Sequence, residues 1–126
     1  MAVTAFLVED NAVIRNNLIP TLAELGGVTV VAFAEGQSEA LHWLGSHEAQ
    51  WELVIVDLFL KEGSGLGVIS GCKARKPDSP VVVLTNYATA DMHRRCLELG
   101  ADAFFDKSSQ LDEFFEYCER HGARAG

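Results

Sequence analysis

The chain has 126 residues, and 48% of them are hydrophobic, which is enough for one domain with its own buried core and no stabilising disulfide or metal. Its formal net charge of −8 excludes the basic face that a free-standing nucleic-acid-binding domain needs. A signal peptide and an apolar run long enough to span a membrane are both lacking. We therefore expect a cytoplasmic domain that binds neither nucleic acid nor membrane directly.

Five short apolar runs, rich in β-branched residues, predict five strands. They are Val3–Val8, Val28–Ala34, Leu53–Val56, residues 80–84 and residues 103–105. The runs do not alternate strictly between apolar and polar residues, which favours strands that are covered on both faces.

Helical periodicity separates these runs, in residues 13–25, 38–47, 66–74 and 90–99. In the first segment Val13, Leu18, Leu22 and Leu25 fall on one apolar stripe, and Pro20 predicts a kink. After the fifth strand, Ser109 and Asp112 form a capping-box pattern that predicts the start of a last helix.

Strands and helices thus alternate five times with short connections. This order predicts an α/β fold, a doubly wound parallel sheet with helices on both faces and right-handed crossovers. We expect the domain to span residues 1–121, with residues 122–126 as a tail or the stump of a linker. Any ligand is expected beyond the carboxyl ends of the strands.

Polar residues stand where these strands end: Glu9 and Asp10, Asp57, Thr85, and Asp106 with Lys107. In a doubly wound sheet the strand ends share one edge, so the side chains are expected to converge there. Carboxylates brought close together repel one another and require a cation. Oxygen ligands of this kind favour a hard divalent ion such as Mg²⁺.

Other reactive residue types give no comparable pattern. Cys72, Cys96 and Cys118 lack metal or redox spacing and are expected to be buried or half-buried free thiols. The four histidines show no triad or metal spacing and are expected at the surface. The stretch "EGSGLG" lacks the lysine of a nucleotide-binding loop.

Four stretches carry a resemblance to a known family: "FLVEDN", "LVIVDLFL", "VVVLTNYA" and "GADAFFDKS". Together they resemble the receiver domain of bacterial two-component response regulators, over the whole chain. The resemblance implies a flavodoxin-like (βα)5 fold with strand order 2-1-3-4-5. The stretch "DLFLKEGSGLGVI" is similar to receivers that accompany helix-turn-helix output domains.

The resemblance implies that Asp57 accepts a phosphoryl group from a histidine kinase, as a signalling phosphoacceptor and not as a conventional enzyme. It implies that Asp10 and Asp57 bind Mg²⁺ directly, with the backbone carbonyl of Phe59 as a further ligand and Glu9 acting through water. The expected partners are a sensor histidine kinase or phosphotransfer protein, an output domain or downstream protein, and a second copy after phosphorylation.

The same resemblance implies that Thr85 and Lys107 hold the phosphoryl oxygens. Thr85 then moves toward the phosphoryl group, and Phe104 swings inward as the switch residue. Many receivers have proline after the lysine, and Ser108 stands there instead. Since a cis bond to a non-proline residue costs about 2.5–4 kcal/mol, we expect a trans or strained junction.

Phe59 and Tyr87 occupy positions that often carry polar residues in relatives, which predicts restricted water access and slow dephosphorylation. Two alternatives stay open. One is a degenerate receiver that acts as a phosphorylation-independent interaction module. The other is an aspartyl-phosphate phosphatase or transferase of the dehalogenase type, a class that requires an acid where Phe59 stands.

Overall fold

The computed structural model describes residues 3–76 and 78–125, apart from the side chains of Glu48 and of residues 121–125. Five parallel strands form one sheet in the order β2-β1-β3-β4-β5, which confirms the predicted order 2-1-3-4-5. The strands are β1 (Val3–Val8), β2 (Val28–Ala34), β3 (Leu53–Val56), β4 (Val81–Thr85) and β5 (Ala103–Asp106).

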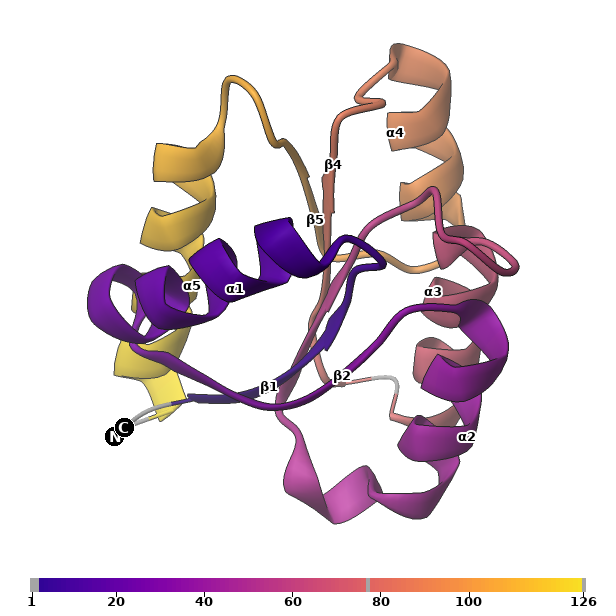
Figure 1. The fold of residues 1–126 in the computed structure, drawn as a ribbon, viewed down its shortest axis with the longest axis horizontal. Helices are drawn as coiled ribbons and strands as arrows, with labels where there is room; N and C mark the ends of the chain where they lie inside the picture. Colours follow the sequence, from indigo (N-terminus) through magenta and orange to yellow (C-terminus); the bar gives the residue numbers. More distant parts are fainter. Residues whose placement is uncertain (1–2, 77, 126) are drawn as a thin grey trace.

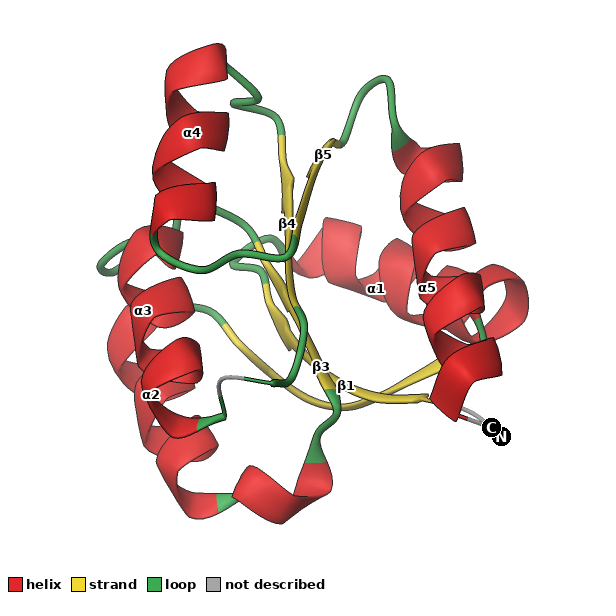
Figure 2. Ribbon diagram, turned by 180° about the vertical axis from the view of Figure 1, so that it is seen from behind, coloured by secondary structure: helices red, strands yellow, loops and turns green. Residues whose placement is uncertain are grey.

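Helices cover both faces of the sheet, and Figures 1 and 2 show α1 and α5 on one side and α2, α3 and α4 on the other. The α-helices are α1 (Ala12–Thr21), α2 (Gln37–Ser46), α3 (Gly65–Arg75), α4 (Ala90–Glu98) and α5 (Leu111–Ala125). A π-helix (Leu22–Gly26) follows α1, and a short 3-10 helix (Glu48–Gln50) follows α2.

The sheet therefore separates two apolar cores. Phe6 and Val8 of β1 belong to the core under α2, α3 and α4, whereas Ala5 and Leu7 belong to the core under α1 and α5. Successive residues of a strand point to opposite faces, and both faces here are covered. Apart from Thr4 and Thr85, the central strands β1, β3 and β4 are consequently apolar, as the sequence predicts.

The second strand departs from that prediction. β2 lies at the edge of the sheet and pairs only with β1, so its burial alternates along the strand. Val31 and Phe33 are 42% and 48% exposed. An edge strand is covered less completely than a central one, and its apolar side chains cannot all be buried.

The predicted stripe on the first helix is wrong in half of its residues. Leu18 and Leu22 are buried, but Val13 and Leu25 are 69% and 53% exposed. The α-helix ends directly after Pro20, and the chain continues in the wider π-helix before Gly27 turns it with a φ of 65°. Proline removes a backbone donor, and the change in helix geometry accounts for Leu25, which lies in the π-helix, but not for Val13 in the first turn of α1.

The last helix begins at Leu111, two residues after Ser109, so the predicted capping box is not at the helix start. Gln110 precedes the first helical residue instead, and its side-chain Nε2 donates to Glu113 Oε2 at 3.0 Å. Helical backbone continues to Ala125, beyond the predicted domain boundary at residue 121. Among the residues that the structure describes, no helix is long and apolar enough to cross a membrane.

Candidate functional site

Adjacent strands bring three carboxylates together at the carboxyl end of the sheet. Val8 pairs with Val56, so the residues that follow β1 and β3 come side by side. The Asp57 amide donates to the Val8 carbonyl at 3.0 Å, which fixes this alignment. One carboxylate oxygen from each of Glu9, Asp10 and Asp57 lies within 4.8 Å of the others.

These acids differ in their exposure to solvent. Glu9 is 2% exposed, whereas Asp10 and Asp57 are half-buried. Burial raises the pKa of Glu9 above its usual value, and the Asp57 charge acts in the same direction. Hydrogen bonding to Lys107 opposes that rise without cancelling it. The cluster is therefore a partly desolvated group of oxygen donors.

Lys107 lies between two of these acids. Its Nζ donates to Glu9 Oε1 at 2.5 Å and to Asp57 Oδ2 at 3.0 Å. Burial acts to lower the pKa of Lys107, but the hydrogen bonds and charges of the two carboxylates outweigh it and raise the pKa overall. One ammonium beside three carboxylates leaves an excess of negative charge.

The Asp57 carboxylate is fixed in orientation. The Leu58 amide donates to its Oδ1 at 2.8 Å, while Lys107 binds Oδ2. The backbone behind it is closely packed, because a Cβ at Gly65 would lie 2.2 Å from the Asp57 carbonyl oxygen. Only glycine allows α3 to begin so close to this strand end.

Thr85 ends β4 at the same edge and is fully buried. Its carbonyl accepts from the Lys107 amide at 2.9 Å, and its hydroxyl accepts from the Tyr87 amide at 3.1 Å. The structure thus brings together Glu9, Asp10, Asp57, Thr85 and Lys107 at the predicted edge.

Phe59 and Tyr87 are two exposed aromatic residues near this edge. Their side chains are 51% and 54% exposed, and their ring centroids lie 4.1 Å apart. They follow Asp57 and Thr85 by two residues each and form a contact between the β3–α3 and β4–α4 loops.

Phe104 is half-buried on β5, and its ring stacks on His93 of α4 with centroids 4.7 Å apart. His93 is exposed, as predicted, but sequence reasoning gave it no partner. The four-residue element β5 carries no signal for which helix its side chains contact.

The residue after Lys107 also has a defined role in the fold. The Ser108 amide and hydroxyl donate to Asp106 Oδ1 at 2.8 and 2.6 Å, and these bonds lower the pKa of Asp106. Within residues 3–76 and 78–125 every peptide bond is trans, which confirms the predicted trans form of the Lys107–Ser108 junction.

Arg15 is the buried residue that sequence reasoning missed. It lies on α1 with 8% exposure, and its Nη1 donates at 2.8 Å both to the Glu9 carbonyl and to Glu35 Oε2. The sequence carries no local signal for these contacts, because Arg15 lies six residues from Glu9 and 20 from Glu35, and neither is a helical i,i+3 or i,i+4 spacing.

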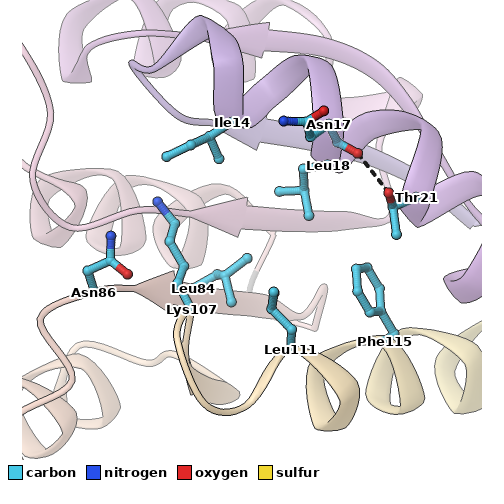
Figure 3. A pocket seen from close by; sticks show the side chains of 9 residues that line it. All are labelled: Ile14, Asn17, Leu18, Thr21, Leu84, Asn86, Lys107, Leu111 and Phe115. Carbon is cyan, nitrogen blue, oxygen red and sulfur yellow. Dashed lines mark hydrogen bonds between the residues drawn. The ribbon is translucent and has the colours of Figure 1, made fainter.

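A hollow of about 360 Å³ lies beside Lys107, between α1 and α5 (Figure 3). Its lining is mainly apolar and consists of Ile14, Asn17, Leu18, Thr21, Leu84, Asn86, Lys107, Leu111 and Phe115. Figure 3 shows Lys107 and Asn86 at one end of this surface.

Comparison with known proteins decides the family. The family model described as the response regulator receiver domain matches residues 5–119 of the sequence. The chain belongs to the response regulator receiver domain family. A putative transcriptional regulator from Pseudomonas aeruginosa is 35% identical over 85% of this receiver domain and 50% of its own length. The chain therefore spans about half the length of that relative.

Solved structures agree with this assignment. The non-phosphorylated HemR receiver domain from Leptospira biflexa is 31% identical and superimposes with a TM-score of 0.80, covering 93% of this chain and 91% of that one. A response regulator from Burkholderia pseudomallei with a phosphorylated aspartic acid, calcium ion and citrate is 26% identical, with a TM-score of 0.79. That match covers 97% of this chain and 69% of the other.

Proposed function

We propose that this receiver domain accepts a phosphoryl group on Asp57 from the phosphohistidine of a kinase or phosphotransfer protein. A carboxylate oxygen forms a bond to phosphorus while the phosphorus–nitrogen bond breaks. The electron pair stays with the imidazole, which takes up a proton. The observation that carries the proposal is the convergence of Glu9, Asp10 and Asp57 with Lys107.

The donor set fits a hard divalent cation. All three acids offer oxygen, the cluster keeps an excess of negative charge beside Lys107, and Asp10 and Asp57 are open to solvent in part. We propose that Asp10, Asp57 and the Phe59 carbonyl hold Mg²⁺, with Glu9 acting through water. When bound, the ion offsets the charge that develops on the transferring phosphoryl oxygens.

The chain's own residues orient the acceptor. The Leu58 amide and Lys107 hold the two oxygens of Asp57, so the carboxylate loses little freedom on reaction. Lys107 is also placed to bind a phosphoryl oxygen once one is attached to Asp57. Thr85, tied to Lys107 through its backbone carbonyl, supplies a hydroxyl at the same edge.

Phosphorylation is proposed to act as a switch through Thr85 and Phe104. Movement of the Thr85 hydroxyl toward the phosphoryl group breaks its bond with the Tyr87 amide and displaces the β4–α4 loop. Phe104 then leaves its stack on His93 and turns inward. Two packings of one fold thereby differ in their affinity for a partner.

The proposed partners are a sensor histidine kinase or phosphotransfer protein and an output domain or downstream protein, in the cytoplasm. A donor protein has to reach Asp57 along the edge where the apolar hollow beside Lys107 lies (Figure 3). Residues 1–121 are proposed as the receiver domain and residues 122–126 as a tail or linker. A homodimer formed after phosphorylation belongs to the same proposal.

Two alternatives are weighed against this proposal. A phosphorylation-independent interaction module would not need Lys107 bonded to both Glu9 and Asp57. A dehalogenase-type phosphatase needs an acid at the position of Phe59, whose side chain is apolar and half exposed. We therefore favour a signalling phosphoacceptor over a conventional enzyme.

The phosphoryl group is expected to be long-lived, because Phe59 and Tyr87 place an aromatic contact between the two loops that follow Asp57 and Thr85. Replacing Phe59 with Asn is predicted to speed dephosphorylation by opening the site to water. The decay of labelled protein gives the measurement. A wild-type half-life of only seconds contradicts the prediction.

The proposal is tested by incubating the chain with Mg²⁺ and a small phosphodonor such as acetyl phosphate. Intact-mass measurement is expected to show one added phosphoryl group that alkali or hydroxylamine removes, and the addition should stop when EDTA is present. Asp57→Asn should prevent it. Asp102→Asn, at a partly exposed acid paired with Lys73 elsewhere on the sheet, is the matched control.

A further inference from the structure

A buried cation, Arg15, contacts residues from more than one loop of the site. Arg15 donates from one nitrogen to the Glu9 carbonyl and to Glu35, each at 2.8 Å, and its guanidinium lies 4.2 Å from the centroid of the Phe33 ring. Three contacts to a side chain that is 9% exposed fix its position.

The first contact fixes the peptide that carries Asp10. The Glu9 carbonyl belongs to the bond between Glu9 and Asp10, at the point where the chain leaves β1. The amide of the same residue donates to the Ala34 carbonyl of β2 at 3.0 Å. The hydrogen bond from Arg15 to the Glu9 carbonyl therefore fixes the orientation of the peptide group that leads into Asp10.

The second contact reaches the loop that follows Asp57. Glu35 accepts from Arg15 through one oxygen and from Lys61 Nζ through the other, both at 2.8 Å. Lys61 lies two residues after Phe59, whose carbonyl is a proposed metal ligand. Glu35 thus links the Glu9 carbonyl, through Arg15, to the end of the Lys61 side chain, which is 64% exposed.

We infer that Arg15 is a positioning residue for the metal site, which it serves by holding the β1–α1 and β3–α3 loops at a fixed spacing through Glu35. This inference rests on the proposed function for its metal. Residues that orient metal ligands from outside typically change metal affinity 10- to 100-fold when they are replaced. Arginine is required because a lysine side chain keeps the charge but is one bond shorter, so its Nζ does not reach the position from which Arg15 Nη1 donates to both acceptors.

The test compares Arg15→Lys with Arg94→Lys. Arg94 is an exposed arginine on α4 that also pairs with two acids, Asp91 and Glu98, away from the site. Amide hydrogen exchange is measured first, without metal. Arg15→Lys is expected to speed exchange at Asn11 and through residues 57–65, whereas Arg94→Lys should leave both segments unchanged.

Magnesium affinity is measured next by calorimetry on the same folded samples. Arg15→Lys is expected to weaken Mg²⁺ binding about tenfold, with Arg94→Lys equal to wild type. Lys61→Met should speed exchange in residues 57–65 alone, because it removes the bond from Lys61 to Glu35 and leaves the bond from Arg15 to the Glu9 carbonyl in place. If Arg15→Lys fails to fold, Glu35→Gln supplies the exchange readout for both loops.

The inference is overturned if Arg15→Lys and Glu35→Gln match Arg94→Lys in exchange at both loops, whatever their stability. It is also overturned if exchange changes but Mg²⁺ affinity does not, since the role is then only structural. Wild-type protein that fails to bind Mg²⁺ contradicts the proposed function, and unchanged exchange in the variants contradicts the role of Arg15 separately.

Discussion

At the scale of single residues, Lys107 determines the charge of the site before any metal or phosphoryl group is present. Its ammonium lies between Glu9 and Asp57 and is 11% exposed, so its charge acts on them with little screening. In the proposed function, Lys107 competes with the metal ion for the same carboxylates and later binds the phosphoryl group. Replacing Lys107 is therefore expected to change metal affinity and the rate of phosphoryl transfer in opposite directions.

Lys107→Met is therefore predicted to raise Mg²⁺ affinity about three- to tenfold, because a nearby positive charge is removed. The same variant should accept phosphoryl groups more slowly, since it lacks the donor beside Asp57. Calorimetry at fixed ionic strength measures the first effect. Lys73→Met, at a lysine bound to Asp102, is the control, and an unchanged or weaker affinity in Lys107→Met contradicts the electrostatic account.

At the scale of elements, the β3–α3 loop and the first turn of α3 are shaped by close approach at glycines. Gly63 of the loop has a φ of 71°, and a Cβ on it or on Gly67 of α3 would lie 2.4 or 2.2 Å from Gln37. Gln37 in turn accepts from the Ser64 amide at 2.9 Å. The glycines thus allow the start of α2 to pack closely against the loop. This packing explains the glycine-rich stretch without a nucleotide-binding role.

Gly65→Ala is predicted to destabilise the domain by about 1–3 kcal/mol, since its Cβ would overlap the Asp57 carbonyl and Leu58 Cα. Gly45→Ala is the matched control. Gly45 lies within α2, where a Cβ comes no closer than 3.5 Å to Arg75, so alanine should stabilise by ~0.5–1 kcal/mol. Urea unfolding separates the two, and equal stability in both variants contradicts the steric account.

The elements also show where sequence reasoning reaches its limit. The central strands could be predicted because they are apolar on both faces, and the site because parallel strands end at one edge. The burial of Arg15 could not, because it depends on Glu35, which lies 20 residues away in the sequence, and the predicted stripe on the first helix wrongly included Val13. The start of α5 was misplaced for a local reason, since Ser108 bonds back to Asp106, two residues away, and the helix begins only at Leu111.

At the scale of the whole molecule, the two cores hold three buried cysteines, as the sequence predicts. Cys72 and Cys96 lie under α2, α3 and α4, and Cys118 lies under α1 and α5. Burial raises the pKa of Cys72 and Cys118 to about 12 and that of Cys96 to about 11. Thiols with such values are almost entirely protonated at neutral pH and react slowly.

Alkylation of the native protein is therefore predicted to require opening of the fold. Labelling by iodoacetamide near pH 8, followed by mass spectrometry, should proceed at the rate of opening and become fast in denaturing urea. Because the two cores share one sheet, all three thiols should become reactive over the same urea range. Selective labelling of one thiol in the absence of denaturant contradicts a single cooperative unit.

The central claim is that Asp57 is the residue which carries the phosphoryl group. Its most direct test is to treat the phosphorylated chain with borohydride, which reduces an acyl phosphate to an alcohol, and to locate the altered residue by peptide mass spectrometry. The account predicts one altered position, at residue 57. Modification at Asp10, Glu9 or any other residue, with residue 57 intact, would contradict it.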